Sequence, residues 1–428
     1  MHGARHGLAE NGPARADDVK LRVPRPIHLA YCLNVHPGET WADQLQAIRT
    51  HAAGVRARVS RGAPFGLGLR LNRRAASDLA EPGACEAFRD EMRASGQYAF
   101  TVNAFPYGVF HGRQVKEQVY APDWRAAERL EYTLAVAGIL AECMPDDTYG
   151  SISTVPGTYR CWAKSESDRL TIARNLAACA WHLAALCRRT GREIVLALEP
   201  EPDCLLETTE DVRAFFQSNA MRQASDETAA QSHAGADEVA GAVRRHLGVC
   251  LDTCHLALQF ESPIESVRTL AGAGIRIAKV QLSAALRAPL TADALARLRA
   301  FVEPVYLHQT RIRDAAGAMR RWPDLTEELL AELRPQSDAE LRCHFHVPLH
   351  FREAGDLRST RGDITALFVA EAARAGCSHF EIETYTFHVL PDPLRAADVV
   401  ESLCREYEDV LEMLAETEPN IHVAAAIP

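Results

Sequence analysis

The amino-acid sequence predicts an α/β protein that folds as a (β/α)8 TIM barrel. Short apolar runs alternate with longer amphipathic segments eight times along the 428-residue chain. Such β-then-α units in series produce a parallel sheet, and eight of them close into a barrel. The competing fold is an open, doubly wound sheet. It is disfavoured because no glycine-rich phosphate-binding sequence follows the first apolar run.

The expected strands and helices follow from the spacing of apolar residues. In the segment Ser167–Arg189 apolar residues recur every three or four positions, which is typical of a helix with one buried face. The expected strands are Ile27–Leu33, Gly66–Leu71, Tyr98–Asn103, Tyr149–Thr154, Ile194–Glu199, Gly248–Asp252, Ile277–Leu282 and His379–Thr384. The expected helices are Thr40–Val59, Trp124–Cys143, Ser167–Arg189, Thr209–Phe216, Ile264–Ala271, Ala292–Phe301, Asp363–Ala375 and Asp398–Glu416.

Two segments interrupt this repeat. Asn219–Val243 is polar and indicates a surface insertion or a polar helix. Tyr306–Leu325 indicates a β-hairpin, and a further extended run follows at Arg342–Leu349. We expect a hairpin and helix insertion at about 304–350, between barrel strands seven and eight, as a lid over the site. The expected organisation is one barrel domain over 25–416, with a disordered tail at 1–24 and a C-terminal tail at 417–428.

Composition and charge restrict the classes of function. The formal net charge is −10 and the arginines form only isolated pairs, so nucleic-acid binding is not expected. The 12 cysteines contain no Cys-x-x-Cys pair, which favours free thiols in a reducing cytoplasm over disulfides or structural zinc. Neither a signal peptide nor an uncharged apolar stretch of 18 residues is present. We therefore do not expect an integral membrane protein.

Ligand-type side chains follow four of the expected strands, at Glu199, Asp252, Gln281 and Glu383. Carboxylates at the ends of apolar strands point into a barrel mouth, where an unpaired charge is costly. One divalent cation, whether Mn, Mg, Zn, Co or Fe, would neutralise the three acidic groups together. Taken singly, a strand-end glutamate could instead pair with an arginine.

Imidazoles are the second ligand type. His344 and His346 alternate along an extended run, so both face one side of it, and His346 is a candidate metal ligand. The alternative is a solvated face of the insertion. His255 follows Asp252 by three residues, as a substrate contact or as part of a local helix cap.

These strand ends resemble those of the xylose-isomerase-like barrel superfamily of sugar-phosphate isomerases, ketose 3-epimerases and endonuclease IV. The resemblance covers roughly residues 27–415 and lies in the sequences LEPEP, CLDTCH, KVQLS and EIETYT. It implies one metal ion held by Glu199, Asp252, Gln281 and Glu383. The position of His255 touches substrate in epimerases and binds a second metal in the nuclease. Gln281 departs from the family pattern, which has histidine there; His346 or His344 would compensate.

A closer similarity is to the EboE-type metabolite traffic proteins of bacterial gene clusters. It lies in the segments 31–41, 103–108, 110–112, 115–124 and 153–156. It implies a small polar metabolite as substrate and a functional link to a membrane prenyltransferase. The loops after the first and third strands ring the barrel mouth. We therefore expect them to supply the substrate wall: Asn34, His36, Asn103, Tyr107 and His111. A plain turn is the alternative for residues 106–108.

Three functions are consistent with these residues. The first is a metal-dependent isomerase or epimerase of a sugar-like polyol, with Glu199 and Glu383 exchanging protons on opposite faces of a carbon. The second is a metal-dependent phosphoesterase, which needs at least two ions. The third is a metabolite-binding or traffic protein that performs no chemistry. The resemblance implies a metal-binding histidine at positions 103 and 281, where this chain has Asn103 and Gln281. These two replacements disfavour the phosphoesterase.

Overall fold

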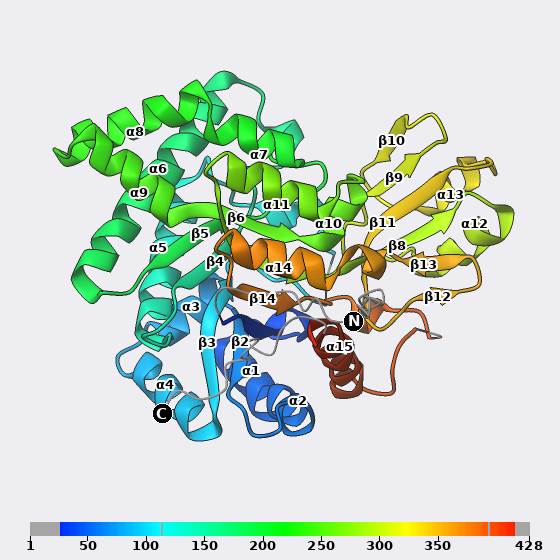
Figure 1. Cartoon of the computed structure of the whole chain (residues 1–428), viewed down its shortest axis with the longest axis horizontal. Helices are drawn as coiled ribbons and strands as arrows, with labels where there is room; N and C mark the ends of the chain where they lie inside the picture. The colour runs from blue at the N-terminus through cyan, green and yellow to red at the C-terminus, as the bar shows by residue number, and fades with distance from the viewer. Residues whose placement is uncertain (1–25, 113, 393, 416–428) are drawn as a thin grey trace, which may run out of the picture.

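The computed structural model describes residues 26–112, 114–392 and 394–415 and confirms the predicted (β/α)8 barrel (Figure 1). Eight parallel strands close in the order β1-β14-β7-β6-β5-β4-β3-β2. The expected tails at 1–24 and 417–428 lie outside the described residues. The barrel strands are β1 (His28–Cys32), β2 (Phe65–Arg70), β3 (Gln97–Asn103), β4 (Gly150–Thr154), β5 (Ile194–Leu198), β6 (Leu247–Asp252), β7 (Arg276–Leu282) and β14 (His379–Ile382).

Helices surround the barrel, and most begin at a side-chain cap. At Ser165, for example, a capping box starts the longest helix by satisfying backbone N–H groups that have no partner within the helix. These helices are α1 (Trp41–Ala47), α2 (Ala53–Val59), α3 (Arg73–Leu79), α4 (Ala84–Ser95), α5 (Ala127–Cys143), α6 (Glu166–Thr190), α7 (Thr209–Phe216), α10 (Thr253–Leu258), α11 (Pro263–Gly272), α14 (Ala366–Arg374) and α15 (Val399–Leu414). The sequence analysis expected no helix between β2 and β3, where α3 and α4 lie. Helix α3 is only seven residues long. In α4 the buried residues Cys85, Phe88 and Met92 do recur at three- and four-residue spacing, so a helical period was present in the sequence there.

The polar segment at 219–243 forms two helices instead of one insertion. They are α8 (Asn219–Ser232) and α9 (Ala236–His246), and both pack against α6. Helix α9 leads directly into β6, so it is the connecting helix of a regular barrel unit. Its buried face is narrow, with only Val239, Ala242 and His246 enclosed, which explains its polar appearance in the sequence.

Helix α6 is, among the described residues, the one helix long and apolar enough by composition to cross a membrane. Half of the window that meets this test is buried inside the protein. The helix packs against α5, α8 and α9, and a core helix satisfies the same criterion.

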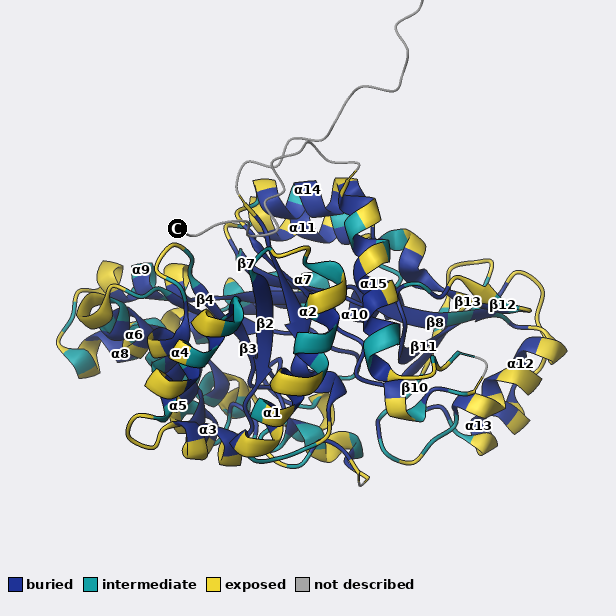
Figure 2. Ribbon diagram, turned by 90° about the horizontal axis from the view of Figure 1, so that it is seen from below, coloured by how far each residue is buried: buried dark blue, intermediate teal, exposed yellow. Residues whose placement is uncertain are grey.

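The insertion between β7 and β14 is a six-stranded sheet with the order β10-β9-β11-β8-β13-β12. It lies on the opposite side of the barrel from α8 and α9 (Figures 1 and 2). The predicted hairpin is present as two antiparallel strands. The sheet begins at Ala284, well before the expected boundary near 304, because its first strand follows β7 almost directly. Its elements are β8 (Ala284–Pro289), α12 (Ala292–Leu298), β9 (Thr310–Arg313), β10 (Met319–Trp322), α13 (Glu327–Glu332), β11 (Glu340–Val347), β12 (Glu353–Ala354) and β13 (Leu357–Ser359).

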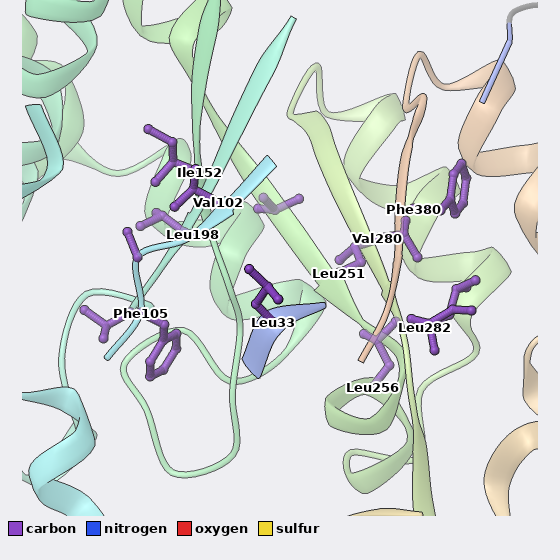
Figure 3. Close-up of a cluster of buried hydrophobic side chains, with 14 of the residues drawn as sticks. Leu33, Val102, Phe105, Ile152, Leu198, Leu251, Leu256, Val280, Leu282 and Phe380 are labelled. Carbon is purple, nitrogen blue, oxygen red and sulfur yellow. The ribbon is translucent and has the colours of Figure 1, made fainter. Parts of the chain in front are cut away.

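The barrel strands are buried on both faces, with different chemistry on each (Figure 2). Alternate residues of a strand point to opposite faces. Apolar side chains such as Val102, Leu251 and Val280 form part of the buried cluster in Figure 3. The residues next to them in sequence are polar and point into the barrel.

Polar side chains form a closed layer inside the barrel. Lys279 and Glu381 make an ion pair of 2.6 Å, and both side chains are completely buried. Asn103 donates to both carboxylate oxygens of Glu381 at 3.1 Å and accepts from the Lys279 ammonium at 3.0 Å. Gly68 makes room for this pair, since a Cβ there would lie 1.6 Å from Glu381 Oε1. Within this layer Lys279, Glu381 and Asn103 pair their charges and hydrogen-bonding groups with one another. The layer lies beneath the barrel mouth, and we call it the polar floor.

Candidate metal and substrate site

Three carboxylates meet directly above this floor. Glu199 follows β5, Asp252 is the last residue of β6, and Glu383 follows β14. All three are buried, and one ligand oxygen from each lies within 4.8 Å of the others. The convergence follows from the fold, because the carboxyl ends of parallel strands open at the same barrel mouth.

The three carboxylates of this cluster lie close together and affect one another's ionisation. Burial raises the pKa of Glu199 well above its usual range, and the negative charge of Asp252 adds to the effect. Burial, then repulsion by Glu199 and Asp252, likewise raises the pKa of Glu383. Burial opposes ionisation of Asp252 too, but the neighbouring imidazoles and a hydroxyl donor hold its pKa below the usual value. Among the described residues, no lysine or arginine forms an ion pair with any of the three, so a bound cation would relieve their repulsion.

Hydrogen bonds orient two of the three carboxylates, Asp252 and Glu383, and leave one buried oxygen of Asp252 without a donor. The Asn34 amide donates to Glu383 Oε1 at 2.6 Å. Asp252 Oδ1 accepts from Ser283 Oγ at 2.6 Å and from two backbone N–H groups at the start of α10, at 2.7 and 3.0 Å. Asp252 Oδ2 is buried and accepts no hydrogen bond. A buried carboxylate oxygen without a donor is costly, and a metal ion is one partner that would satisfy it.

Three imidazoles lie beside the carboxylates: His255 on α10, and His344 and His346 on β11. The Nε2 atoms of His255 and His344 are 3.1 Å apart, and those of His344 and His346 are 3.2 Å apart. The Nε2 atom of His346 is 4.0 Å from Asp252 Oδ2. Burial lowers the pKa of His346 to about 4 and that of His344 well below its usual value, which favours neutral rings. Both residues are buried, so the solvated face considered for them is not observed.

Gln281 does not occupy the position expected of a metal ligand. Its Nε2 donates to Asn103 Oδ1 at 3.1 Å, and its Oε1 accepts from the Cys250 thiol at 3.1 Å. Both ends of the amide are therefore used within the polar floor, and the side chain is completely buried. Hydrogen bonding to Asn103 and Cys250 turns the residue away from the ligand position that its place on β7 had suggested.

A pocket opens over the carboxylates and imidazoles. Of the residues expected to bind substrate, Asn34, Asn103 and His255 line it. Glu201 also lines it and accepts from Tyr120 Oη at 2.8 Å; burial raises the pKa of this carboxyl to about 7. The remaining lining residues are Phe105, Pro106, Phe110, Val115, Lys116, Val119, Tyr120, Glu199, Tyr306, Leu307, His344, His346, Glu383 and Tyr385.

Three residues expected in the substrate wall do not line this pocket. His36 hydrogen bonds to the Tyr31 hydroxyl at 2.6 Å and belongs to the buried core. Tyr107 packs edge-on against the ring of Tyr132, at a centroid distance of 5.1 Å. His111 lies one layer behind the pocket, where its Nε2 donates to the Asn34 carbonyl at 2.7 Å. His111 therefore holds the backbone of Asn34 and does not line the pocket itself.

Aromatic residues from the barrel loops and from the insertion line the pocket, and sequence reasoning missed them. The rings of Phe110, Tyr306 and Tyr385 pack on one another with centroid distances of 5.1 to 5.4 Å. Lys116 bonds to Asp324 at 2.7 Å and thus ties a barrel loop to the insertion. These contacts join segments far apart in sequence, and no local pattern marks them. A signal was present for Glu201 alone, in its spacing two residues after Glu199.

Comparison with known proteins finds likeness in structure alone. No family model matches the chain, and no curated protein matches it in sequence. Similar solved structures include an L-ribulose 3-epimerase (TM-score 0.46, 10% identity, covering 94% of this chain and 98% of that one). Others are the IolI protein with a zinc atom (0.45, 12%, 92% and 100%) and a xylose isomerase domain protein from Alicyclobacillus acidocaldarius (0.42, 12%, 91% and 99%). With likenesses as remote as these, the chemistry of this chain must be deduced from its own residues.

Proposed function

We propose that the chain is a metal-dependent isomerase or epimerase that acts on a small sugar-like or polyol metabolite. The observation that supports it is the convergence of Glu199, Asp252 and Glu383 within 4.8 Å. All three are buried, and no lysine or arginine among the described residues forms an ion pair with them. Oxygen ligands suit Mn, Mg, Zn, Co or Fe. Such an ion supplies a positive charge that polarises a carbonyl or hydroxyl oxygen beside it.

The side chains around the pocket provide the remaining parts of this chemistry. Glu199 and Glu383 line the pocket from strands β5 and β14, which are not neighbours in the barrel. From these two strands one carboxyl can hold a proton while the other accepts one from a substrate carbon. Asn34 fixes the orientation of Glu383, and the polar floor holds the cluster from below.

The proposal is tested by exchange of substrate hydrogen with solvent. Wild type, Glu199→Gln and Glu383→Gln are incubated in deuterated buffer with Mn²⁺ or Mg²⁺ and a panel of ketoses and polyols. Deuterium entry at carbon is followed by NMR. We expect each variant to lose roughly 10²- to 10⁴-fold in exchange rate, as general acid–base groups do. The exposed Glu131→Gln is the matched control and retains full activity. Full activity in both site variants contradicts the proposal.

We also infer a role in metabolite traffic and precursor maturation in the cytoplasm, with a functional link to a membrane prenyltransferase. The support for this is the motif resemblance given above, at residues 31–41 and 115–124 in particular. A chain that binds its metabolite and performs no chemistry would show saturable ligand binding by calorimetry and no deuterium entry.

A further inference from the structure

One side of the pocket is an apolar wall that the isomerase chemistry leaves unused. It consists of Phe110, Val119, Tyr306, Leu307 and Tyr385, all of which line the pocket. The three aromatic rings belong to a hydrophobic cluster that is separate from the main core. We propose that this wall binds an uncharged apolar substituent, aryl or alkyl, and that the substrate is a sugar-like polyol that carries one. The inference rests on the proposed function for the polar part of that substrate.

The first argument concerns Lys116, the one lysine or arginine among the described residues that line the pocket. An ammonium group has three protons to donate. Its Nζ donates to the carbonyls of Glu303 at 3.2 Å and Tyr306 at 2.6 Å, and to the carboxylate of Asp324 at 2.7 Å. These bonds use all three protons within the protein. Lys116 therefore offers a ligand its aliphatic stem, and a phosphate group on the substrate would find no free lysine or arginine here.

The second argument concerns the hydroxyl of Tyr306. The Asn34 carbonyl can only accept, so Nε2 of His111, at 2.7 Å from it, carries a proton. Burial lowers the pKa of His111 to about 3, and its ring is neutral at pH 7. Its Nδ1 is therefore an acceptor, and the Tyr306 hydroxyl donates to it at 2.5 Å. The proton of this tyrosine is used inside the protein, and the pocket receives the ring.

The hydroxyl of Tyr120, which also lines the pocket, is used in the same way. It donates to Glu201 Oε1 at 2.8 Å and accepts from Gln309 Nε2 at 3.1 Å. A sugar hydroxyl placed on this side of the pocket would thus find few partners, and a buried hydroxyl without a partner is costly. An apolar group needs no partner and gains free energy by leaving water.

The third argument concerns the position of the wall relative to the carboxylates. Tyr385 follows Glu383 by two residues, and its ring packs on that of His346 at a centroid distance of 4.6 Å and on that of Tyr306 at 5.1 Å. The wall therefore begins directly beside the polar site, and one ligand can contact both. The Tyr385 hydroxyl makes no hydrogen bond among the described residues, so its proton is available to the oxygen that joins sugar and substituent.

The wall combines two parts of the fold. Phe110 and Val119 lie between β3 and α5, whereas Tyr306 and Leu307 lie in the insertion between α12 and β9. The insertion thus adds apolar surface to a mouth whose own strand ends are polar. We therefore expect the insertion to determine which substituent is accepted, while the strand ends act on the polyol.

The test compares methyl and phenyl glycosides of the same sugar as ligands of the full-length protein. Binding is measured by isothermal titration calorimetry with Mn²⁺ present, for the β-glycosides of glucose, galactose, xylose and mannose. We expect the phenyl member of at least one pair to bind about 10- to 100-fold tighter, as burial of one aromatic ring allows. Equal affinities within every pair, or no binding of any phenyl glycoside, overturn the proposal.

Variants of the wall assign the preference to these residues. Leu307→Asn keeps a similar volume and adds a polar group, and should weaken binding of the preferred phenyl glycoside about 10-fold. The matched control is Leu367→Asn, an exposed leucine on α14, which keeps the wild-type affinity. The smaller change Val119→Thr is tested in parallel, with circular dichroism to verify folding. A full phenyl preference in both folded wall variants overturns the proposal.

Binding is read without turnover, so this proposal and the proposed function fail separately. Deuterium entry into a sugar, without a preference for phenyl glycosides, leaves the isomerase standing and overturns the apolar site. A phenyl preference that Leu307→Asn reduces, without deuterium entry into any compound, supports the apolar site and contradicts the isomerase.

Discussion

Two carboxylates of one segment, Glu381 and Glu383, have opposite surroundings although both point into the barrel. Glu381 is paired with Lys279 at 2.6 Å and accepts twice from Asn103. Glu383 meets two further carboxylates and receives one hydrogen bond, from Asn34. Lys279 thus provides a cation for Glu381, whereas no lysine or arginine among the described residues forms an ion pair with Glu383. The difference supports the proposal that a bound cation completes the charge balance at the mouth, as Lys279 does for Glu381 in the layer below.

The largest effect on stability is expected from removing the charge of Lys279 inside the barrel. Lys279→Met leaves Glu381 buried and unpaired, and losing one partner of a buried ion pair costs about 3–5 kcal/mol. We expect the free energy of unfolding to fall by this amount, measured by urea denaturation at pH 7. The double variant Lys279→Met/Glu381→Gln removes both charges and should recover most of the loss. A double variant no more stable than Lys279→Met would show that packing, and not charge, holds this layer.

Glu406 is a third buried carboxylate, and its surroundings differ from those of both Glu381 and Glu383. Glu406 on α15 is completely buried and its Oε1 has no donor. No lysine or arginine among the described residues forms an ion pair with it. Burial raises its pKa to about 7, above the value of about 4.3 in an unfolded chain. The folded state therefore holds this proton more tightly. The stability it gives is complete below about pH 4 and is lost as the pH rises to about 7.

Glu406→Gln stays uncharged and should remove this pH dependence. Between about pH 4 and pH 8 the variant should gain roughly 4 kcal/mol relative to wild type, at 1.36 kcal/mol per pKa unit. Urea denaturation across that range measures the difference, with the exposed Glu408→Gln on the same helix as the control. Parallel curves for wild type and Glu406→Gln would refute the expectation.

The smallest effect is expected from adding a methyl group at Gly68, next to the ion pair of Lys279 and Glu381. A methyl group in Gly68→Ala would meet Glu381 Oε1 at 1.6 Å, so the carboxylate must move away from Lys279. We expect a loss of about 1–3 kcal/mol, as for other overpacked cores. Gly138→Ala on α5 adds the same methyl group where no atom lies within 4 Å, and should be neutral or gain up to about 1 kcal/mol. Equal melting temperatures for the two variants would contradict this account.

The sequence located all eight barrel strands because short runs with apolar residues alternate with longer amphipathic segments, although strands such as Gly150–Thr154 also carry polar side chains. It also identified Glu199, Asp252 and Glu383 as neighbours, since strand ends in a parallel barrel share one mouth. It missed α3, which is only seven residues long, and α4, although Cys85, Phe88 and Met92 are spaced as on one face of a helix. It missed β8 as well, because Ala284–Pro289 follows β7 with only Ser283 between them.

Local pattern and tertiary contact thus determine different features of this protein. Hydrophobic periodicity sets the order of strands, and with it the edge at which the acidic residues gather. Side-chain direction within the barrel depends on partners from other strands. Gln281 is drawn into the floor by Asn103 and Cys250, which lie far from it in sequence. The meeting of His255 with His344 and His346 likewise required the inserted sheet to fold back over the mouth, and no repeat in the sequence encodes that distance.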